Sequence, residues 1–460
     1  MLIVAATVIA ATPAIAQNTE DQNAFDFSLP GARSRGIGGA FVAIADDATS
    51  VYSNPAGLTR LFRPEVSIEA RHWDRTSRTL HSGHLFGPAS GIGADAIDGP
   101  VERDFRSGVT GVSFMSVVYP GDRWAAGVFR HQLARYRMDR RIEGPFFDCT
   151  GGYRGEAASA PFCEPHARAD GVDREFPKQQ SLALDIQSTG AAFAYKWPVG
   201  LAAGIAVQYF DFRLSSVNKV FTARDGQKYL PPHFADPENL ELIGSQSGDD
   251  HAWAANAGVL WDVSSRWAVG ASFRQGPSFE FATSTVTGPR EGSRLIVAQS
   301  DNPFRVPDTF SVGVLHRLTN FWHLSFEYDR VNYHQLIDDF RNTALRPGDP
   351  ESDLVASGVR LDSANQLRFG AEYLWLTPGS RVLAFRGGVW TDPSAQAYFD
   401  ADPATGLPAP RWAVLLPRRD GTVHLTGGLG FTTRRHFQID AAVDFSEFVN
   451  TLSVSTVWRF

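Results

Sequence analysis

Fourteen segments of this chain alternate apolar and polar side chains residue by residue, and this pattern constrains the fold more than any other feature. The segment 266–275 illustrates it: one face is apolar, and the other carries Arg266, Gly270, Ser272 and Arg274. A period of two is the signature of a β-strand, because successive side chains point to opposite faces. Each segment spans about 10 residues, the length that a tilted strand needs to cross a bilayer.

The predicted strands are 65–73, 111–119, 123–135, 182–195, 199–212, 251–261, 266–275, 309–318, 321–331, 366–376, 381–390, 421–431, 436–446 and 451–460. The connections between them alternate between short and long. Tight turns occupy 120–122, 196–198, 262–265, 319–320, 377–380 and 432–435. Long loops occupy 74–110, 136–181, 213–250, 276–308, 332–365 and 391–420. Only the last connection on the long-loop side, 447–450, is short.

This alternation indicates the architecture. A soluble sandwich has no reason to collect its long loops at one end, whereas outer-membrane barrels place short turns in the periplasm and long loops outside. The sequence therefore predicts an all-β fold, a fourteen-stranded antiparallel transmembrane β-barrel over residues 65–460. Both chain ends then lie on the periplasmic side. We expect a monomer in the outer membrane of a Gram-negative-type bacterium, surrounded by outer-membrane lipid.

The last predicted strand alternates up to a C-terminal phenylalanine, through Leu452, Val454, Thr456, Trp458 and Phe460. A closed wall suits a membrane because every backbone group in lipid must be paired. The terminal pattern resembles the one that outer-membrane barrels present to their assembly machinery. We therefore expect the barrel-assembly machinery to be a partner through Phe460.

The N-terminus and the two cysteines both favour export. Residues 1–16 are predicted to be a signal peptide, because an apolar run ends in an Ala-x-Ala-like cleavage site. No basic residue precedes that run, and the alternative is an apolar tail. Cys149 and Cys163 lie in a stretch rich in glycine and proline, and in an exported protein they predict a disulfide.

Composition and motifs exclude several function classes. The formal net charge is −7 and the basic residues are scattered, so no nucleic-acid surface is expected. The sequence contains no phosphate-binding loop, dinucleotide fingerprint, His-Glu-x-x-His run or Cys-x-x-Cys pair. We expect no cofactor, no metal and no enzymatic activity, which suits a passive conduit.

Residues 31–60 differ from the rest because they are rich in glycine and show no strand pattern. Since this segment begins on the periplasmic side, residues 17–64 are predicted to fold into the barrel as a plug. Its glycines allow close approach to the wall, and its proline stiffens the following turn. Its two aspartates can cap a helical turn or pair with lumen arginines. The residues concerned are Gly38, Gly39, Asp46, Asp47, Asn54, Pro55 and Ala56.

This segment resembles the N-terminal plug of the long-chain fatty-acid transporter family (FadL/TodX type). The similar residues are Gly-Gly-Ala-Phe-Val-Ala-Ile-Ala-Asp-Asp-Ala at 38–48 and the Asn-Pro-Ala turn at 54–56. The stretches 370–373 and 386–389, with Asp392-Pro393, are similar to late strands of the family. The resemblance implies a plugged fourteen-stranded barrel that moves hydrophobic compounds inward, with a lateral opening in the third strand. Gly57 departs from this pattern and occurs in broader relatives that do not all carry fatty acids.

Inward-facing arginines and apolar loop residues are the candidate ligand contacts. By parity, Arg274, Arg317, Arg368 and Arg386 face the lumen, where they either hold a carboxylate head group or neutralise the plug aspartates. Apolar loop residues either form a landing site or pack on one another. They are Phe146, Phe147, Phe162, Leu230, Phe234, Leu240, Leu242 and Ile243.

These features predict an outer-membrane channel for passive uptake of hydrophobic small molecules, either fatty acids or aromatic hydrocarbons. The plug is either displaced by ligand or a static seal. The main alternative is a binding or assembly partner in secretion or surface attachment, with a closed lumen. A third hypothesis is a lipid hydrolase using His323 and Ser325, but their parity places both in the lumen, away from lipid.

Overall fold

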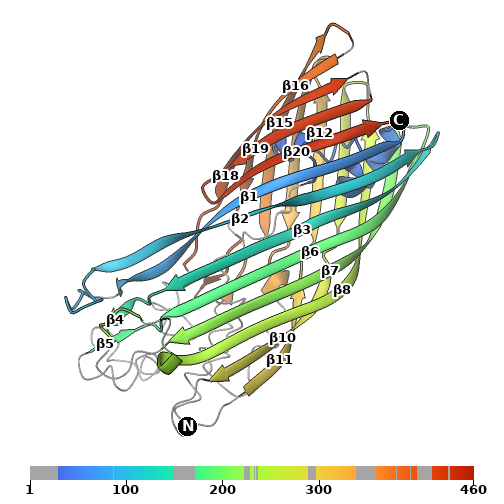
Figure 1. Ribbon diagram of the computed structural model, residues 1–460. Coiled ribbons are helices and arrows are strands. Elements are labelled where there is room, and N and C mark those ends of the chain that lie inside the picture. The colour runs from blue at the N-terminus through green and yellow to red at the C-terminus, as the bar shows by residue number, and fades with distance from the viewer. Residues whose placement is uncertain are drawn as a thin grey trace.

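The computed structural model describes residues 29–85, 87–148, 171–221, 228–232, 234, 237–287, 297–337, 359–379, 381–393, 395–400, 417–433 and 436–460. Within them, fourteen strands form one closed antiparallel ring (Figure 1). In ring order they are β1 (Glu65–Leu85), β2 (Gly99–Pro120), β3 (Trp124–Ile142), β6 (Lys178–Lys196), β7 (Leu201–Phe221), β8 (Leu240–Asp262), β9 (Trp267–Arg274), β12 (Thr309–Arg317), β13 (Trp322–Val331), β15 (Ala364–Thr377), β16 (Arg381–Asp392), β18 (Thr422–Thr433), β19 (Phe437–Phe445) and β20 (Val449–Arg459). Pairing of β1 with β20 closes the ring. The predicted fourteen-stranded barrel is confirmed.

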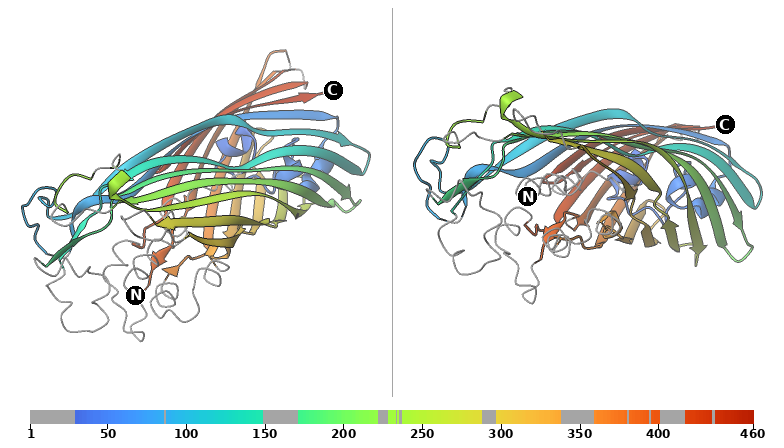
Figure 2. Two further views of the ribbon diagram at one scale, coloured as in Figure 1. Left: turned by 60° about the horizontal axis from the view of Figure 1, so that its bottom comes forward. Right: turned by 90° about the horizontal axis from the view of Figure 1, so that it is seen from below.

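The strands from β1 to β8 are much longer than predicted. β8 has 23 residues and β2 has 22, whereas a bilayer needs about 10. Their extra length extends past the apolar part of the wall on the long-loop side, where Figure 2 shows them projecting beyond the later strands. Residues 74–85, 99–110, 136–142, 178–181, 213–221 and 240–250, which were predicted as loop, therefore continue strands of the wall.

Several short elements lie in the long connections. β10 (Ser278–Thr287) and β11 (Val297–Arg305) form a hairpin that extends the sheet beside β8. β4 (Phe146–Asp148) and β5 (Val172–Arg174) pair with each other, as do β14 (Val359–Arg360) and β17 (Tyr398–Phe399). The 3-10 turn η5 spans Pro237–Asn239. The predicted signal peptide, Cys149 and Cys163 lie outside the described residues.

The two faces of the wall differ as the alternation predicts. Large apolar side chains point outward and stay exposed around the ring, among them Val117, Val128, Phe193, Ile205, Val259, Val269, Phe326, Phe369, Leu429 and Val454. Polar side chains on the inner face are buried, among them Ser116, Gln208, Asn256, Glu327, Arg368 and Asp440. An apolar outside around a polar inside is the arrangement of a membrane-spanning β-barrel of the outer-membrane type. In the described part of the chain, no helix has the length and apolar character needed to cross a bilayer.

Residues 29–61 lie inside this ring, at the short-turn end (Figure 2). They form α3 (Ala32–Gly36), α4 (Ser50–Ser53) and the 3-10 helix η2 (Pro55–Arg60). α3 contacts β16, β18, β19 and β20, whereas η2 contacts β6, β7 and β8 on the opposite side of the ring. The plug therefore spans the lumen from wall to wall.

The outward face provides a test of which segment sits in lipid. We expect Ile205→Arg to lower the free energy of unfolding by about 2–4 kcal/mol, because it places a charge on the lipid-facing side of β7. The matched variant Ser215→Arg lies on the same face of β7, beyond the apolar part, and should change stability little. Denaturant unfolding in vesicles, followed by tryptophan fluorescence, measures both. Equal losses in the two variants would contradict the assigned membrane segment.

Candidate functional site

β2 and β3 are neighbours in the ring, but they are hydrogen-bonded only near the short-turn end. Their pairing runs from Pro120 opposite Ala125 to Phe114 opposite His131 and then stops. Beyond that point, among the described strands, β2 pairs only with β1, and β3 pairs only with β6. A window therefore separates two neighbouring strands of the wall.

Two β-bulges lie at the lower edge of this window. Ser113 is an extra residue in β2 relative to β1, and Leu133 is an extra residue in β3 relative to β6. A bulge bends its strand and increases the local twist, so the two strands diverge at this level. Val112, beside Ser113, is 52% exposed on the apolar outer face. The lower edge of the window therefore lies within the apolar part of the wall.

The outer end of the window is closed by the far end of β1. The main-chain N–H groups of Glu143 and Gly144 both donate to the carbonyl oxygen of His81, each at 3.1 Å. β4 then pairs in parallel with the last residues of β1. Inside, the Arg140 side chain of β3 reaches Thr79 of β1, with Nη1 donating to Oγ1 at 3.0 Å. The window is therefore bounded at both ends.

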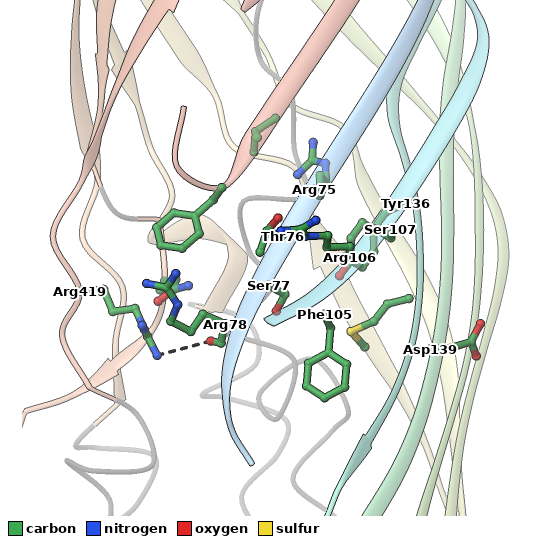
Figure 3. Close-up of a pocket in the computed structure, with 14 residues that line it drawn as sticks. Arg75, Thr76, Ser77, Arg78, Phe105, Arg106, Ser107, Tyr136, Asp139 and Arg419 are labelled. Carbon is green, nitrogen blue, oxygen red and sulfur yellow. Dashed lines mark hydrogen bonds between the residues drawn. The ribbon is translucent and has the colours of Figure 1, made fainter. Parts of the chain in front are cut away.

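An open pocket lies at this window (Figure 3). It is lined by residues 75–78 of β1, residues 105–107 of β2, and side chains of β3 and of the β18–β20 region. Arginines and aromatic rings both line it: the Arg75 guanidinium lies 6.0 Å from the centre of the Tyr136 ring. A lining that combines cationic and apolar groups suits an amphiphilic ligand.

The pocket adjoins the largest buried apolar cluster, which fills the lumen at the long-loop end. Tyr136 and Met138 belong to both. At the centre of the cluster, the Phe212 ring stacks on Phe279 at 4.7 Å and on Phe304 at 5.3 Å between centroids. No sequence pattern predicted that these three phenylalanines form a site. The alternating pattern of β7 places Phe212 on the inner face, so that pattern could have indicated Phe212. Its partners Phe279 and Phe304 lie in a segment that was predicted to be a loop.

The predicted apolar loop residues mostly pack within the loops. Phe146 is buried, with its ring stacked on Tyr229 at 5.7 Å and the Arg174 guanidinium 4.9 Å from its centre. Leu242 and Phe147 are also buried. Of the set, Leu230 is 46% exposed, and Phe162 lies outside the described residues. Phe146, Phe147 and Leu242 are therefore packed against other residues, which agrees with the second of the two alternatives given for this set.

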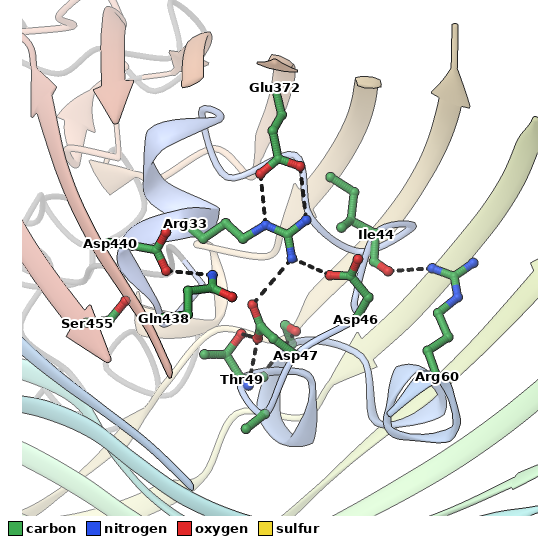
Figure 4. A network of polar contacts seen from close by, with 12 residues as sticks. Arg33, Ile44, Asp46, Asp47, Thr49, Arg60, Glu372, Gln438, Asp440 and Ser455 are labelled. Carbon is green, nitrogen blue, oxygen red and sulfur yellow. Dashed lines mark hydrogen bonds and ion pairs between the residues drawn. The ribbon is translucent and has the colours of Figure 1, made fainter. Parts of the chain in front are cut away.

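On the plug side, Arg33 is the centre of an ion-pair network (Figure 4). Its guanidinium makes a two-bond contact with Glu372 of β15, in which Nε donates to Oε1 and Nη2 to Oε2, each at 3.0 Å. Nη1 pairs with Asp46 at 2.5 Å and with Asp47 at 3.7 Å. Burial raises the pKa of Asp47, and Arg33 and Thr49 oppose that rise. One plug arginine thus joins the two plug aspartates to the wall.

The network continues along the wall. Arg386 pairs with Glu372 and with Asp440, each at 2.7 Å. A second plug contact joins Arg35 to Asp444 at 3.4 Å. Because breaking a buried, hydrogen-bonded pair costs about 3–5 kcal/mol, these contacts hold the plug firmly in one position.

The Asn-Pro-Ala turn anchors the other side of the plug. The Asn54 amide Nδ2 donates to the carbonyl oxygens of Val42, at 2.9 Å, and of Val259 in the wall, at 3.1 Å. Its Oδ1 accepts from the N–H of Ala56 at 3.2 Å. Pro55 then begins η2, a position where its missing N–H costs nothing. Asn54 therefore joins the plug to β8 and also starts the next helix.

Inward-facing glycines of the wall provide the space for the plug backbone. A Cβ on Gly388 of β16 would lie 2.4 Å from the nitrogen of Gly38, and one on Gly370 of β15 would lie 2.3 Å from the Ile37 oxygen. Gly38 and Gly39 themselves have positive φ angles of 68° and 77°. Gly204, Gly258 and Gly270 make similarly close approaches to the plug on the other side of the ring.

The four predicted lumen arginines have different surroundings. Arg368 pairs with Asp329 and donates to the Gly38 oxygen at 3.2 Å, so it joins Arg386 in holding the wall and plug. Arg274 is buried, 5.9 Å from the Tyr52 ring centre. Arg317 lies near the short turns, 3.7 Å from Asp262. Contact between any of them and a ligand head group stays a prediction.

The residues of the hydrolase hypothesis bond to separate partners. His323 Nδ1 lies 3.4 Å from a Glu372 oxygen, and the Ser325 hydroxyl donates to the Gly370 carbonyl at 3.4 Å. A nucleophilic serine needs a base within hydrogen-bond reach, and His323 is bonded elsewhere. In the described part of the chain, no group of three His, Cys, Asp or Glu side chains is placed to hold a metal ion.

Comparison with known proteins supports the resemblance through structure alone. No protein-family model matches the sequence, and no curated protein matches it. The structure of a Pseudomonas aeruginosa FadL homologue matches with a TM-score of 0.61 at 12% identity, over 95% of this chain and 100% of that one. The Pseudomonas putida toluene transporter TodX matches with a TM-score of 0.55 at 14% identity, over 95% and 100%.

The Ralstonia pickettii toluene transporter TbuX gives a TM-score of 0.53 at 16% identity, over 95% of this chain and 100% of that one. This chain has the FadL-type fold. The FadL-type resemblance noted in residues 31–60 is thus confirmed at the level of fold.

The close approach of plug and wall in this FadL-type barrel is testable with two adjacent glycines. We expect Gly388→Ala to weaken plug docking by about 1–3 kcal/mol, because its Cβ collides with the Gly38 backbone. Gly387→Ala is the control, since its Cβ would meet nothing closer than 4.0 Å. Hydrogen exchange of amides 31–60 should speed up in the first variant only. If hydrogen exchange of these amides is unchanged in both variants, the close contact between Gly38 and Gly388 is contradicted.

Proposed function

We propose that this protein is an outer-membrane channel for the passive uptake of long-chain fatty acids or other hydrophobic small molecules. The observation that carries the proposal is the window between β2 and β3, which opens beside the apolar cluster of the lumen. Tyr136 and Met138 belong to both features. The names of structures with this fold, two toluene transporters and a FadL homologue, support a hydrophobic substrate.

The proposed path begins at the long-loop end. A hydrophobic molecule enters the lumen by displacing packed aromatic side chains such as Phe212 and Phe279, which are buried in this structure. The plug blocks the axial route below them, because Arg33 and Asn54 hold it to opposite sides of the wall. The molecule then leaves sideways through the window. Each buried CH₂ contributes roughly 0.8 kcal/mol toward staying out of water, so passage into lipid is favourable.

The pocket favours a ligand with an anionic end. Arg386 and Arg368 are already paired with carboxylates, whereas Arg106 is an exposed cation at the window. We therefore place a carboxylate head group at the window, near Arg75 and Arg106, with its apolar tail toward Tyr136. A neutral aromatic hydrocarbon would use the apolar part alone.

The remaining parts of the chain have supporting roles in this proposal. Residues 1–16 direct export, residues 17–64 form the plug, and residues 65–460 form the barrel. Phe460 is recognised by the assembly machinery, and the barrel acts as a monomer without enzymatic activity. We propose that the plug stays seated while the ligand leaves sideways.

Narrowing the window tests the proposal. We expect Ser107→Trp to lower the initial rate of labelled oleate uptake severalfold in a deletion strain, because Ser107 lines the window pocket. Thr110→Trp is the control, since it adds the same volume to β2 on its exposed outer face. A parallel measurement with labelled toluene shows whether neutral hydrocarbons share the route.

Two outcomes would contradict the proposal. If deleting the gene leaves uptake of both compounds unchanged, the chain does not transport them, and a binding or assembly role becomes the better account. If Ser107→Trp and Thr110→Trp transport equally well, the molecule does not leave through the window. Migration of unheated samples on denaturing gels confirms that each variant is a folded barrel.

A further inference from the structure

Basic side chains adjoin tryptophans at four strand ends on the short-turn side of the barrel. The adjacent pairs are Arg123–Trp124, Lys196–Trp197, Arg266–Trp267 and Trp458–Arg459. The four tryptophans are 41%, 42%, 45% and 57% exposed, so they face the surroundings of the barrel and not its interior. They come from β3, the end of β6, β9 and β20, which are spread around the ring.

The short turns themselves add further basic and apolar groups. Arg63 and Arg381 are exposed at this end, together with apolar side chains that have no packing role there. Among these are Phe62, which is 97% exposed, Val199 at 73% and Leu318 at 52%. In the described residues of these turns, Asp122 is the only carboxylate.

Carboxylates at neighbouring strand ends already have cationic partners. Asp262 is shared by Arg60, Lys196 and Arg317, and Glu65 pairs with Arg459. The basic side chains of Arg63, Arg123, Arg266 and Arg381 therefore leave an excess of positive charge at this end. On the long-loop side, several partly exposed arginines have carboxylate partners, as in the pairs Arg78–Asp104, Arg135–Asp185 and Arg419–Glu102.

We propose that this end of the barrel binds anionic phospholipid head groups of the inner leaflet of the outer membrane. Tryptophan prefers the head-group level of a bilayer, and a neighbouring cation then lies at the height of the phosphates. The distribution favours lipid over an acidic protein, because the basic groups surround the barrel, whereas a protein would contact one side. This ring does not depend on what the channel transports.

The test compares two sets of three substitutions in the full-length, detergent-purified protein. The first set is Arg123→Gln, Arg266→Gln and Arg381→Gln. The control set removes the same charge from exposed positions on the long-loop side, Arg137→Gln, Arg141→Gln and Arg213→Gln. Native mass spectrometry then counts bound palmitoyl-oleoyl-phosphatidylglycerol and, separately, the phosphatidylcholine with the same chains.

We expect the wild type and the control set to retain phosphatidylglycerol in preference to phosphatidylcholine. The first set should lower the affinity for phosphatidylglycerol by roughly fivefold at each of the three positions, because they lie on different sides of the ring and each bound head group loses one neighbouring cation. High salt should weaken the wild-type preference in the same direction. Gel migration of unheated samples confirms that each set of variants is folded.

The proposal is overturned if the wild type binds both lipids equally. It is also overturned if the first set of substitutions retains the wild-type preference, since the bound lipid is then held elsewhere on the barrel.

Discussion

The structure depends on one constraint: at membrane depth, each strand must hydrogen-bond to a neighbour on both sides. Pairing of β1 with β20 meets this requirement at the point where the chain ends meet. The wall departs from it between β2 and β3, above the Phe114–His131 pair. The bulges at Ser113 and Leu133 mark the lower end of this unpaired stretch. Contacts of β1 with Glu143 and Arg140 of the β3 side mark its outer end. The opening is therefore a built feature of a wall that is otherwise continuous.

The same closed ring creates a polar interior that must be filled. The plug fills it with polar contacts to the wall: Arg33 to Glu372, Arg35 to Asp444, and Asn54 to the main chain of β8. Glycines at inward positions let the plug backbone approach to contact distance. Charge neutralisation and close backbone packing thus act together to hold these residues across the lumen.

Much of the fold follows from the sequence because alternation is a local property. Every strand of the ring was predicted from the period-two pattern, and so was the inward parity of residues such as Arg386 and Ser325. The lengths of β1 to β8 were not predicted, because beyond the bilayer the outer face becomes polar while the inner face of β3 carries apolar side chains such as Tyr136 and Met138, so the apolar-outside pattern does not continue. The window also escaped prediction, since it is set by the absence of pairing between two strands that each look regular.

The site shows a similar division. The glycine-rich segment predicted a plug, but the partner of Arg33 is 339 positions away in sequence, and no local pattern connects them. Phe212, Phe279 and Phe304 meet through the curvature of the wall and a hairpin within a predicted loop. The Asp46-Asp47 pair was expected either to cap a helical turn or to pair with lumen arginines. In the structure both aspartates contact Arg33 of the plug itself, and Asp47 Oδ1 also accepts from the N–H of Thr49 at 2.9 Å, just before α4.

The central claim is that a hydrophobic molecule passes through the apolar lumen and leaves through the window. Photolabelling of the full-length protein in membranes, with a fatty acid that carries a diazirine in its tail, tests this most directly. The account predicts crosslinks to peptides containing Phe212 and to window peptides containing Phe105, Tyr136 or Met138. Crosslinks confined to outward-facing residues such as Ile205 or Phe369, with none in the lumen, would contradict it.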